Sequence, residues 1–542
     1  MPPTGFCCHA RGEKRTRMEQ QLAFPQIQKA ASPPQWCKLF IQRLLSLFFA
    51  DDRSPDNRSI IDLQRRACWI GLALVLQALN EAVSIIPPQW YTAHLPFIDP
   101  WKGTISFCLI LGSFFMMWMA FRQRTLRQQS RRLAKHPYRW QCAALILVLL
   151  TCIAGVAEVG LTIQVDFLQA PQYTNDGTSL DAYAAMVLLQ GKDPYVDSNM
   201  ERVVRLFSLD PSWTTPLREG QFANQETYPS PVEMRTVLDT DLKSGQAPEF
   251  EAKVSYPSLS FLTLVPLVWL GIGNVLPFYF LCYIVLVALG WSVARRELRP
   301  WIIVFALANV SMWSSVVGGN LDLLTILFLV LAWLWRERRW PSALVLGLAM
   351  ACKQPAWFYV LFYAILVFRT YDWKEVVRRL TIAGLVMLAF NLPFILWDAK
   401  AWLAGVMAPV SDPMFATGVG IVGLVGSPYL HSYLPSIIYA ILEYGVFYPL
   451  CLMWYWRVCK AHPEAAMLLA VLPLFFAWRS LPSYFACAAF PMFILLAARG
   501  NTSKGSLPRH PPALTGPTHS NPSEDASEEQ RENAKHEVLA LA

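Results

Sequence analysis

Acidic residues in the segment 173-YTNDGTSLDAYAAMVLLQGKDPY-195 are the residues of this chain best suited to chemistry. A carboxylate that faces a cleft can act as a general acid or base. Asp176 and Asp181 are the candidates, and each has a structural alternative. Asp176 lies in a good turn sequence, and Asp181 fits a capping box in which Thr178 begins a helix. Asp193 precedes a proline and is interpreted as a turn residue.

Two basic residues could complement these carboxylates by holding an anion. Arg479 interrupts an apolar region, where a charge is costly and is typically functional. Lys353 ends the apolar stretch 341-PSALVLGLAMACK-353, so it either binds an anion or extends its amine to the membrane surface.

Three further polar residues lie near the ends of apolar runs. Asn320 follows Gly318-Gly319 and either donates to a ligand oxygen or only belongs to a tight turn. Asp322 lies one turn into the next apolar run, so it either faces a cleft or sits at the water boundary. His431 is a candidate in a loop, where a plain surface role is the alternative.

The composition indicates what kind of elements must position these residues. Of 542 residues, 54% are hydrophobic and 15% are charged, and the mean hydropathy is +0.33. A soluble protein could not bury so much apolar surface, so we predict an all-α polytopic membrane protein with about twelve transmembrane helices. A further re-entrant or interfacial segment is predicted at 256–273, where Pro257 and Pro266 favour a broken helix.

The basic residues orient the predicted helices. The net charge of +8 comes from Lys and Arg between the apolar runs, so it indicates membrane topology and not nucleic-acid binding. Short basic loops such as 122–139, 295–299 and 336–339 stay in the cytoplasm, which predicts a multi-pass protein, in the plasma membrane if bacterial, with both termini cytoplasmic. The candidate residues then gather at the outer face.

This topology divides the chain into four parts. Residues 1–60 form a cytoplasmic tail, partly disordered, and 61–139 hold two additional transmembrane helices and a basic loop. Residues 140–499 form the membrane core, with a large outer loop at 166–255. Residues 500–542 form a polar C-terminal tail that is predicted to be disordered. Within the outer loop, apolar residues at helical spacing predict a short helix over 178–190.

Several segments, taken in order, resemble glycosyltransferase family 87, a mannosyltransferase-like group with the GT-C fold. The outer-loop segment above carries Asp176-Gly177, Y-A-A and G-K-D-P-Y. It is followed by Tyr256-Pro257, then by 318-GGNLDLLTILFLVLAWLWRERRWPSALVLGLAMACKQP-355, and finally by 478-WRSLPSYF-485. The likeness covers roughly 140–499. The chain departs from the family pattern in an insertion around 201–253 and in its two additional N-terminal helices.

The resemblance implies an inverting transfer of a hexose, by analogy mannose, from a polyprenyl-phosphate-sugar to a hydroxyl on the extracytoplasmic face. Asp176 matches the family's loop aspartate as general base, with Asp181 the alternative, because the alignment across 176-DGTSLD-181 is ambiguous. Lys353 and Arg479 would stabilise the phosphate leaving group.

The implied partners are a lipid-linked donor, membrane lipid and a glycan, lipid or protein acceptor. Substrate-binding residues are predicted to be Lys353, Arg479, Asn320, Asp322, His431 and Tyr256. No cofactor or metal cluster is indicated; a divalent ion between Asp176 and Asp181 is possible but unsupported. The competing function is a transporter or lipid-linked sugar flippase, for which Glu81, Glu158 and Glu443 in or near the apolar runs are the relevant residues.

Overall fold

The computed structural model describes residues 43, 45–49, 58–85, 101–122, 139–244, 249–426 and 434–502. His431 and most of the two predicted terminal tails lie outside these residues. The described chain is mostly helical, and seven of its helical segments are long and apolar enough to cross a membrane. It is a multi-pass membrane protein.

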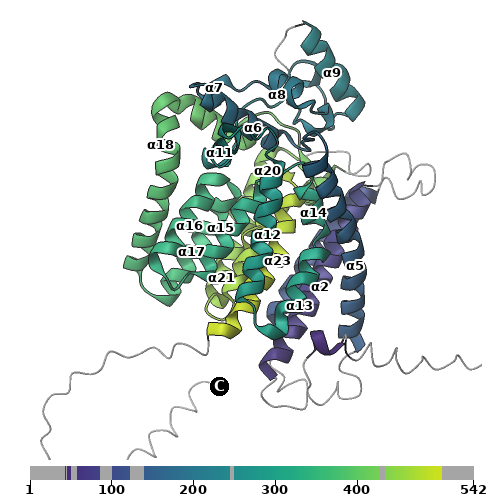
Figure 1. The fold of residues 1–542 in the computed structure, drawn as a ribbon, viewed down its shortest axis with the longest axis vertical. Helices are drawn as coiled ribbons and strands as arrows, with labels where there is room; N and C mark the ends of the chain where they lie inside the picture. The colour runs from purple at the N-terminus through teal and green to yellow at the C-terminus, as the bar shows by residue number, and fades with distance from the viewer. Residues whose placement is uncertain are drawn as a thin grey trace, which may run out of the picture.

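The membrane-spanning candidates stand roughly parallel in one bundle (Figure 1). They are α2 (Arg58–Ile85), α4 (Lys102–Arg122), α5 (Arg139–Ile163) continued by η3 (Gln164–Leu168), α12 (Leu276–Val293), α18 (Trp373–Ser411), α20 (Ser436–Ala440) continued by η7 (Ile441–Phe447) and α21 (Tyr448–Val458), and α23 (Pro482–Thr502). Shorter helices complete the bundle: α13 (Arg299–Ala308), α14 (Val310–Val316), α15 (Asp322–Leu334), α16 (Arg339–Cys352), α17 (Pro355–Thr370), and the η8 (Pro463–Ala465), α22 (Ala466–Leu469) and η9 (Leu472–Phe476) series.

The predicted number of about twelve spans is not reached by helices of full spanning length. The predicted span at 301–317 is divided, because α13 ends and α14 begins at Asn309, which departs from helical geometry (φ −79°, ψ 63°). α18 is bent at Asp398, where the backbone is extended (φ −149°, ψ 97°). Apolar runs therefore overstate the number of full-length helices in this chain.

The two helices predicted to be additions to the core are packed tightly on it. α2 contacts α4, α5, α14 and α23. The buried Gln77 of α2 donates from Nε2 to the Phe485 carbonyl (3.2 Å), and its own carbonyl accepts the Ser311 hydroxyl (3.1 Å). Polar groups inside an apolar bundle need such partners, so α2 is fixed in place.

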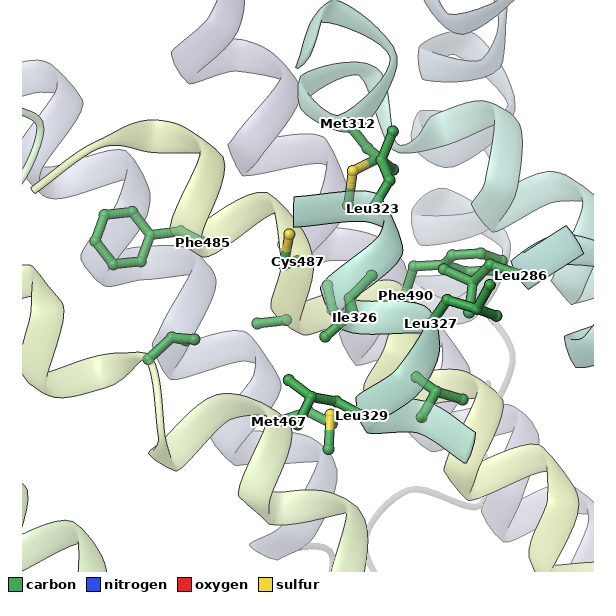
Figure 2. Packing of buried hydrophobic residues seen from close by; sticks show 14 of the residues in the cluster. Leu286, Met312, Leu323, Ile326, Leu327, Leu329, Met467, Phe485, Cys487 and Phe490 are labelled. Atoms are coloured by element: carbon green, nitrogen blue, oxygen red, sulfur yellow. The ribbon is translucent and has the colours of Figure 1, made fainter. Parts of the chain in front are cut away.

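The core lies where α15 packs against α12 and α23. Leu323, Ile326 and Leu327 of α15 lie beside Cys487 and Phe490 of α23 (Figure 2). α15 is apolar on every side, as a helix surrounded by protein must be.

The outer loop forms a compact layer over one end of the bundle, opposite the end where α23 stops (Figure 1). Its elements are α6 (Asp176–Leu189), α7 (Pro194–Asp197), α8 (Met200–Phe207), η4 (Pro211–Trp213), η5 (Gly220–Phe222) and α9 (Pro231–Ser244). The predicted broken segment at 256–273 contains two short helices, α10 (Leu259–Leu262) and α11 (Val265–Trp269), and both contact α6.

Short elements at the same end join distant parts of the chain. β1 (Thr417–Gly418) pairs in parallel with β2 (Arg479–Ser480), and α19 (Ile421–Val425) follows β1. At the other end of the bundle, η6 (Arg296–Leu298) joins α12 to α13 (Figure 1). The β1–β2 pair brings Arg479 beside the loop that follows α18.

Candidate functional site

One large cavity, of about 1360 Å³, lies beneath the outer loop. It collects most of the residues predicted from the sequence, although they come from distant segments. The predicted residues that line it are Asp176, Tyr256, Asn320, Asp322, Lys353 and Arg479. Its walls include apolar residues of α17, α18 and α21, so a water-facing layer and the bundle share one space.

Asp176 is the first residue of α6, and a neighbouring residue caps this helix. Asn175 is the N-cap, and its Oδ1 accepts the backbone N–H of Thr178 (2.7 Å). The prediction that Thr178 is the N-cap of a helix starting at 178 is therefore wrong. The Thr178 hydroxyl instead donates to the carbonyl of Gly319 (3.2 Å). This hydroxyl, which the predicted capping box needed, therefore makes a tertiary contact.

The turn at Gly318 and Gly319 holds this start of α6 in place. Thr174 donates its hydroxyl to the Val317 carbonyl (2.7 Å), and Asn175 donates Nδ2 to the Gly319 carbonyl (2.7 Å). Both glycines have positive φ (72° and 88°), a backbone conformation that suits glycine. The backbone of the turn thus fixes the position of Asp176.

Gly318→Ala is expected to lower the free energy of unfolding by about 1–3 kcal/mol, because alanine at positive φ is strained. An added Cβ would also lie 2.5 Å from the Thr174 backbone nitrogen. Thermal unfolding of the full chain in detergent measures the change. Gly384→Ala is the control, since nothing lies within 4 Å of its added Cβ. Equal stability of the two variants would show that the turn tolerates side chains.

One of the two carboxylate oxygens of Asp176 has a well-formed hydrogen bond. Its Oδ1 accepts the backbone N–H of Gly177 (2.8 Å), whereas Oδ2 is buried without a well-formed hydrogen bond. Burial raises the pKa of Asp176, while contacts with Thr215 and the positive charge of Arg479 act in the opposite direction. A carboxylate with a raised pKa and a vacant oxygen in a cavity is suited to accept a proton.

Asp181 is fully buried and does not line the cavity. Its Oδ1 accepts the Ser260 hydroxyl of α10 (2.7 Å), which ties α6 to the broken segment. Burial raises the pKa of Asp181 to about 7, against the opposing effects of Ser260 and Lys353. Asp181 is therefore neither the predicted capping residue nor a group that faces the cavity.

Lys353 and Asp322 form a buried ion pair in the cavity wall. Lys353 Nζ lies 2.7 Å from Asp322 Oδ1, and both side chains are about 7% exposed. The ammonium also lies 5.0 Å from the ring centroid of Tyr256, as a cation–π contact. Lys353 thus does not extend to the membrane surface, and Asp322 faces the cleft, which was one of its two predicted positions.

Arg479 is the cation of the cavity that lacks an acidic partner. In the described part of the chain no carboxylate lies within salt-bridge distance of its guanidinium, which contacts Met414 Sδ. Its positive charge nevertheless acts to lower the pKa of Asp176. Arg479 can therefore bind an anion without first breaking an ion pair.

Asn320 has the predicted turn role, since its Oδ1 accepts the Asp322 backbone N–H (2.7 Å), and it also lines the cavity. Asp193 likewise has its predicted turn role, because it caps α7 by accepting the Tyr195 N–H (2.9 Å). His431 lies outside the described residues, so its predicted role is not tested.

The cavity is also lined by residues that were not predicted from the sequence to belong to a site. Trp213, Thr215 and Glu251 come from the loop insertion, and no motif marks them. Glu81, Glu158 and Glu443 were noticed only as acids in or near apolar runs. Glu81 accepts the Ser314 hydroxyl (2.7 Å), so the N-terminal helix α2 helps to form the wall.

A divalent ion between Asp176 and Asp181, which the sequence did not support, gains no support from their positions either, because only Asp176 lines the cavity. Across the residues that the structure describes, no group of three or more His, Cys, Asp and Glu side chains is placed to hold a metal ion.

Comparison with known proteins finds a similarity to one family, over a stretch that includes part of this site. The model of Glycosyltransferase family 87 matches residues 255–496, which confirms the resemblance predicted from the sequence. No curated protein and no solved structure matches the chain. Tyr256, Asn320, Asp322, Lys353 and Arg479 lie within the matched residues, whereas Asp176 and Asp181 precede them. The chain is therefore similar to glycosyltransferase family 87 over residues 255–496, and this family indicates a glycosyltransferase.

Proposed function

We propose that the protein transfers a hexose, mannose by analogy with the family, from a polyprenyl-phosphate-hexose to a hydroxyl acceptor on the extracytoplasmic face of the membrane. The observation that carries this proposal is that Asp176 and the unpaired Arg479 line the same cavity. A base for the acceptor and a cation for a phosphate leaving group are the two functions such a transfer needs.

The reaction is a single displacement with inversion. As the acceptor oxygen bonds to the sugar C1, its proton passes to Asp176. The bond between C1 and the phosphate oxygen breaks on the opposite side, and its electron pair stays with the phosphate. Arg479 stabilises this charge, and the Lys353–Asp322 pair shapes the wall beside it.

An apolar arm of the cavity suits the prenyl chain of the donor. It includes Phe358, Met407, Val410, Tyr444 and Tyr448 from three helices. Met407, Val410 and Tyr444 are also exposed on the surface of the bundle. A lipid chain can therefore leave the cavity sideways while its phosphate stays near Arg479.

Arg479→Ala is expected to weaken both donor binding and turnover, each by about 10–100-fold, because a charge-assisted contact to phosphate is worth about 1.5–3 kcal/mol. Binding and transfer would be measured on the full chain in lipid nanodiscs with synthetic polyprenyl-phosphate-mannose and -glucose. Arg235→Ala is the matched control, since Arg235 pairs with Asp210 on the loop surface (2.7 Å). Unchanged donor binding in Arg479→Ala would remove Arg479 from the phosphate site.

A lipid-linked sugar flippase is the second candidate function. Glu81, Glu158 and Glu443 line the same cavity from three long helical segments, as the polar residues of a transport path would. The same nanodiscs distinguish the two: a transferase consumes donor and forms a glycoside, whereas a flippase moves intact donor between leaflets of a vesicle.

A further inference from the structure

The roof of the cavity is formed by two paired stretches of the outer-loop insertion. Thr215 accepts the backbone N–H of Glu251 through its carbonyl (2.8 Å), and Pro216 and Phe250 form an antiparallel bridge next to it. Trp213, Thr215 and Glu251 all line the cavity. All three precede residue 255, so they lie outside the family match and nothing in that match assigns them a role.

Trp213 presents an aromatic ring to this space. It ends η4, a turn held by Asp210, whose Oδ1 accepts both the backbone N–H (2.9 Å) and the hydroxyl (2.7 Å) of Ser212. The side chain lines the cavity and is 48% exposed, an unusual position for tryptophan in a loop facing water. A tryptophan that lines a cavity offers an aromatic face on which a ligand can stack.

Glu251 is buried yet incompletely bonded. It is 3% exposed, and its Oε1 accepts the backbone N–H of Lys253 (2.8 Å). Its Oε2 is buried and accepts no hydrogen bond from a donor group in the described chain, and the carboxylate of Asp412 can bond to Glu251 only when one of the two acids carries a proton. Burial, and next to it the neighbouring carboxylate of Asp412, raise the pKa of Glu251 to about 8. An incompletely bonded polar atom in a cavity wall is costly unless a ligand completes it.

We propose that Trp213, Thr215 and Glu251 form a subsite for a sugar ring of the acceptor, which would make that acceptor a glycoside or glycan. This inference rests on the proposed function.

The chemistry of the three side chains matches a hexose. The C–H face of a sugar ring carries slight positive charge and stacks on the negative face of an indole. Glu251 can exchange hydrogen bonds with ring hydroxyls through Oε2. Thr215 contacts Asp176, so a ring seated on the roof would present a hydroxyl next to the proposed base.

The charges of the roof favour the acceptor over the donor. The donor needs a cation for its phosphate and an apolar path for its lipid, and both lie elsewhere, at Arg479 and along the bundle. Lys253, the nearest basic residue of the roof, is paired with Asp412 (2.5 Å). The roof therefore offers an aromatic ring and hydrogen-bonding groups, as a sugar requires, without an unpaired cation among Trp213, Thr215, Glu251 and Lys253.

The test compares kinetic constants for donor and acceptor in the full chain. The acceptors are octyl glycosides of mannose, glucose, galactose and N-acetylglucosamine, with the donors named above. Trp213→Ala and Glu251→Gln are each expected to raise the KM for the preferred octyl glycoside about 10-fold, with the donor KM unchanged. Trp213→Phe keeps a stacking ring and should recover most of the affinity. Glu249→Gln is the control, because Glu249 lies two residues away but does not line the cavity.

Each possible result either supports the acceptor subsite or overturns it. Donor binding and thermal unfolding show whether a variant is folded, so a folded variant with a normal acceptor KM overturns the subsite. A raised donor KM with a normal acceptor KM would place the donor sugar there instead and also overturns it. Transfer from donor to water alone, with no octyl glycoside used by the wild type, likewise overturns it. If the wild type neither binds nor consumes any donor, the proposed function itself fails.

Discussion

Asp176→Asn is expected to reduce sugar transfer about 10²–10⁴-fold, the usual loss when a general base is removed. The amide keeps the size of the carboxylate but cannot accept the acceptor's proton. Since Asn can still accept the Gly177 N–H, the start of α6 should be preserved, and donor binding with it. The measurement is turnover of polyprenyl-phosphate-hexose in nanodiscs, alongside donor binding.

The pH profile gives a second measurement of the same residue. Burial raises the pKa of Asp176, and only the deprotonated form can accept a proton. The wild-type rate should therefore fall as the pH is lowered through this raised pKa, and the residual rate of Asp176→Asn should lack that step.

Asp181→Asn is the matched control, because Asp181 lies in the same helix but outside the cavity. Full turnover in Asp176→Asn combined with loss in Asp181→Asn would transfer the base role to Asp181. Full turnover in both variants would reject a carboxylate base in α6 altogether.

Breaking the buried pair of Lys353 and Asp322 is expected to lower the free energy of unfolding by about 3–5 kcal/mol, because either single change leaves one buried charge without its partner. Asp322→Asn isolates the ammonium, and Lys353→Met isolates the carboxylate. Both side chains are only about 7% exposed, so water cannot easily replace the lost partner. Chemical or thermal unfolding in detergent measures the loss.

The double variant separates charge from shape. Asp322→Asn combined with Lys353→Met removes both charges, and it should be more stable than either single variant. Control changes at the exposed pair of Arg205 and Glu201 (2.8 Å) should cost less than about 1 kcal/mol. A double variant that loses the sum of the single losses would show that the two residues stabilise the protein independently.

The sequence indicated which candidate residues would lie at one end of the bundle, but it did not give the details of the helices around them. Because short basic loops stay in the cytoplasm, the sequence placed Asp176, Lys353 and Arg479 at the same face of the membrane. All three line the one cavity. Residue type alone could not reveal that Lys353 and Asp322 pair, because their contact joins the end of one helix to the start of another. The local sequence pattern also gave the wrong N-cap at Thr178. The Thr178 hydroxyl bonds to the Gly319 carbonyl, and Asn175 caps the helix.

Other features had no signal that a single sequence could show. Apolar runs predicted about twelve spans, but hydropathy does not register the break at Asn309 or the bend at Asp398. Glu251 stands in a polar insertion without periodicity, so only the folded loop reveals that it is buried. Its neighbours Trp213 and Thr215 reach the cavity through the pairing of Pro216 with Phe250, a long-range contact.

Two separate segments of the chain line the cavity, and this has a consequence for how the acceptor specificity of such a protein could change during evolution. The region that matches the family supplies Arg479, Lys353 and the apolar arm, whereas the preceding outer loop supplies Asp176 and the roof. Under the proposed roles, these segments correspond to the two substrates. At the start of α6 the loop donates hydrogen bonds to the backbone carbonyls of Val317 and Gly319, so the side chains of the roof can diverge without disturbing that junction. Evolution could thus redirect the enzyme to new acceptors by remodelling one loop while its use of a lipid-linked donor stays the same.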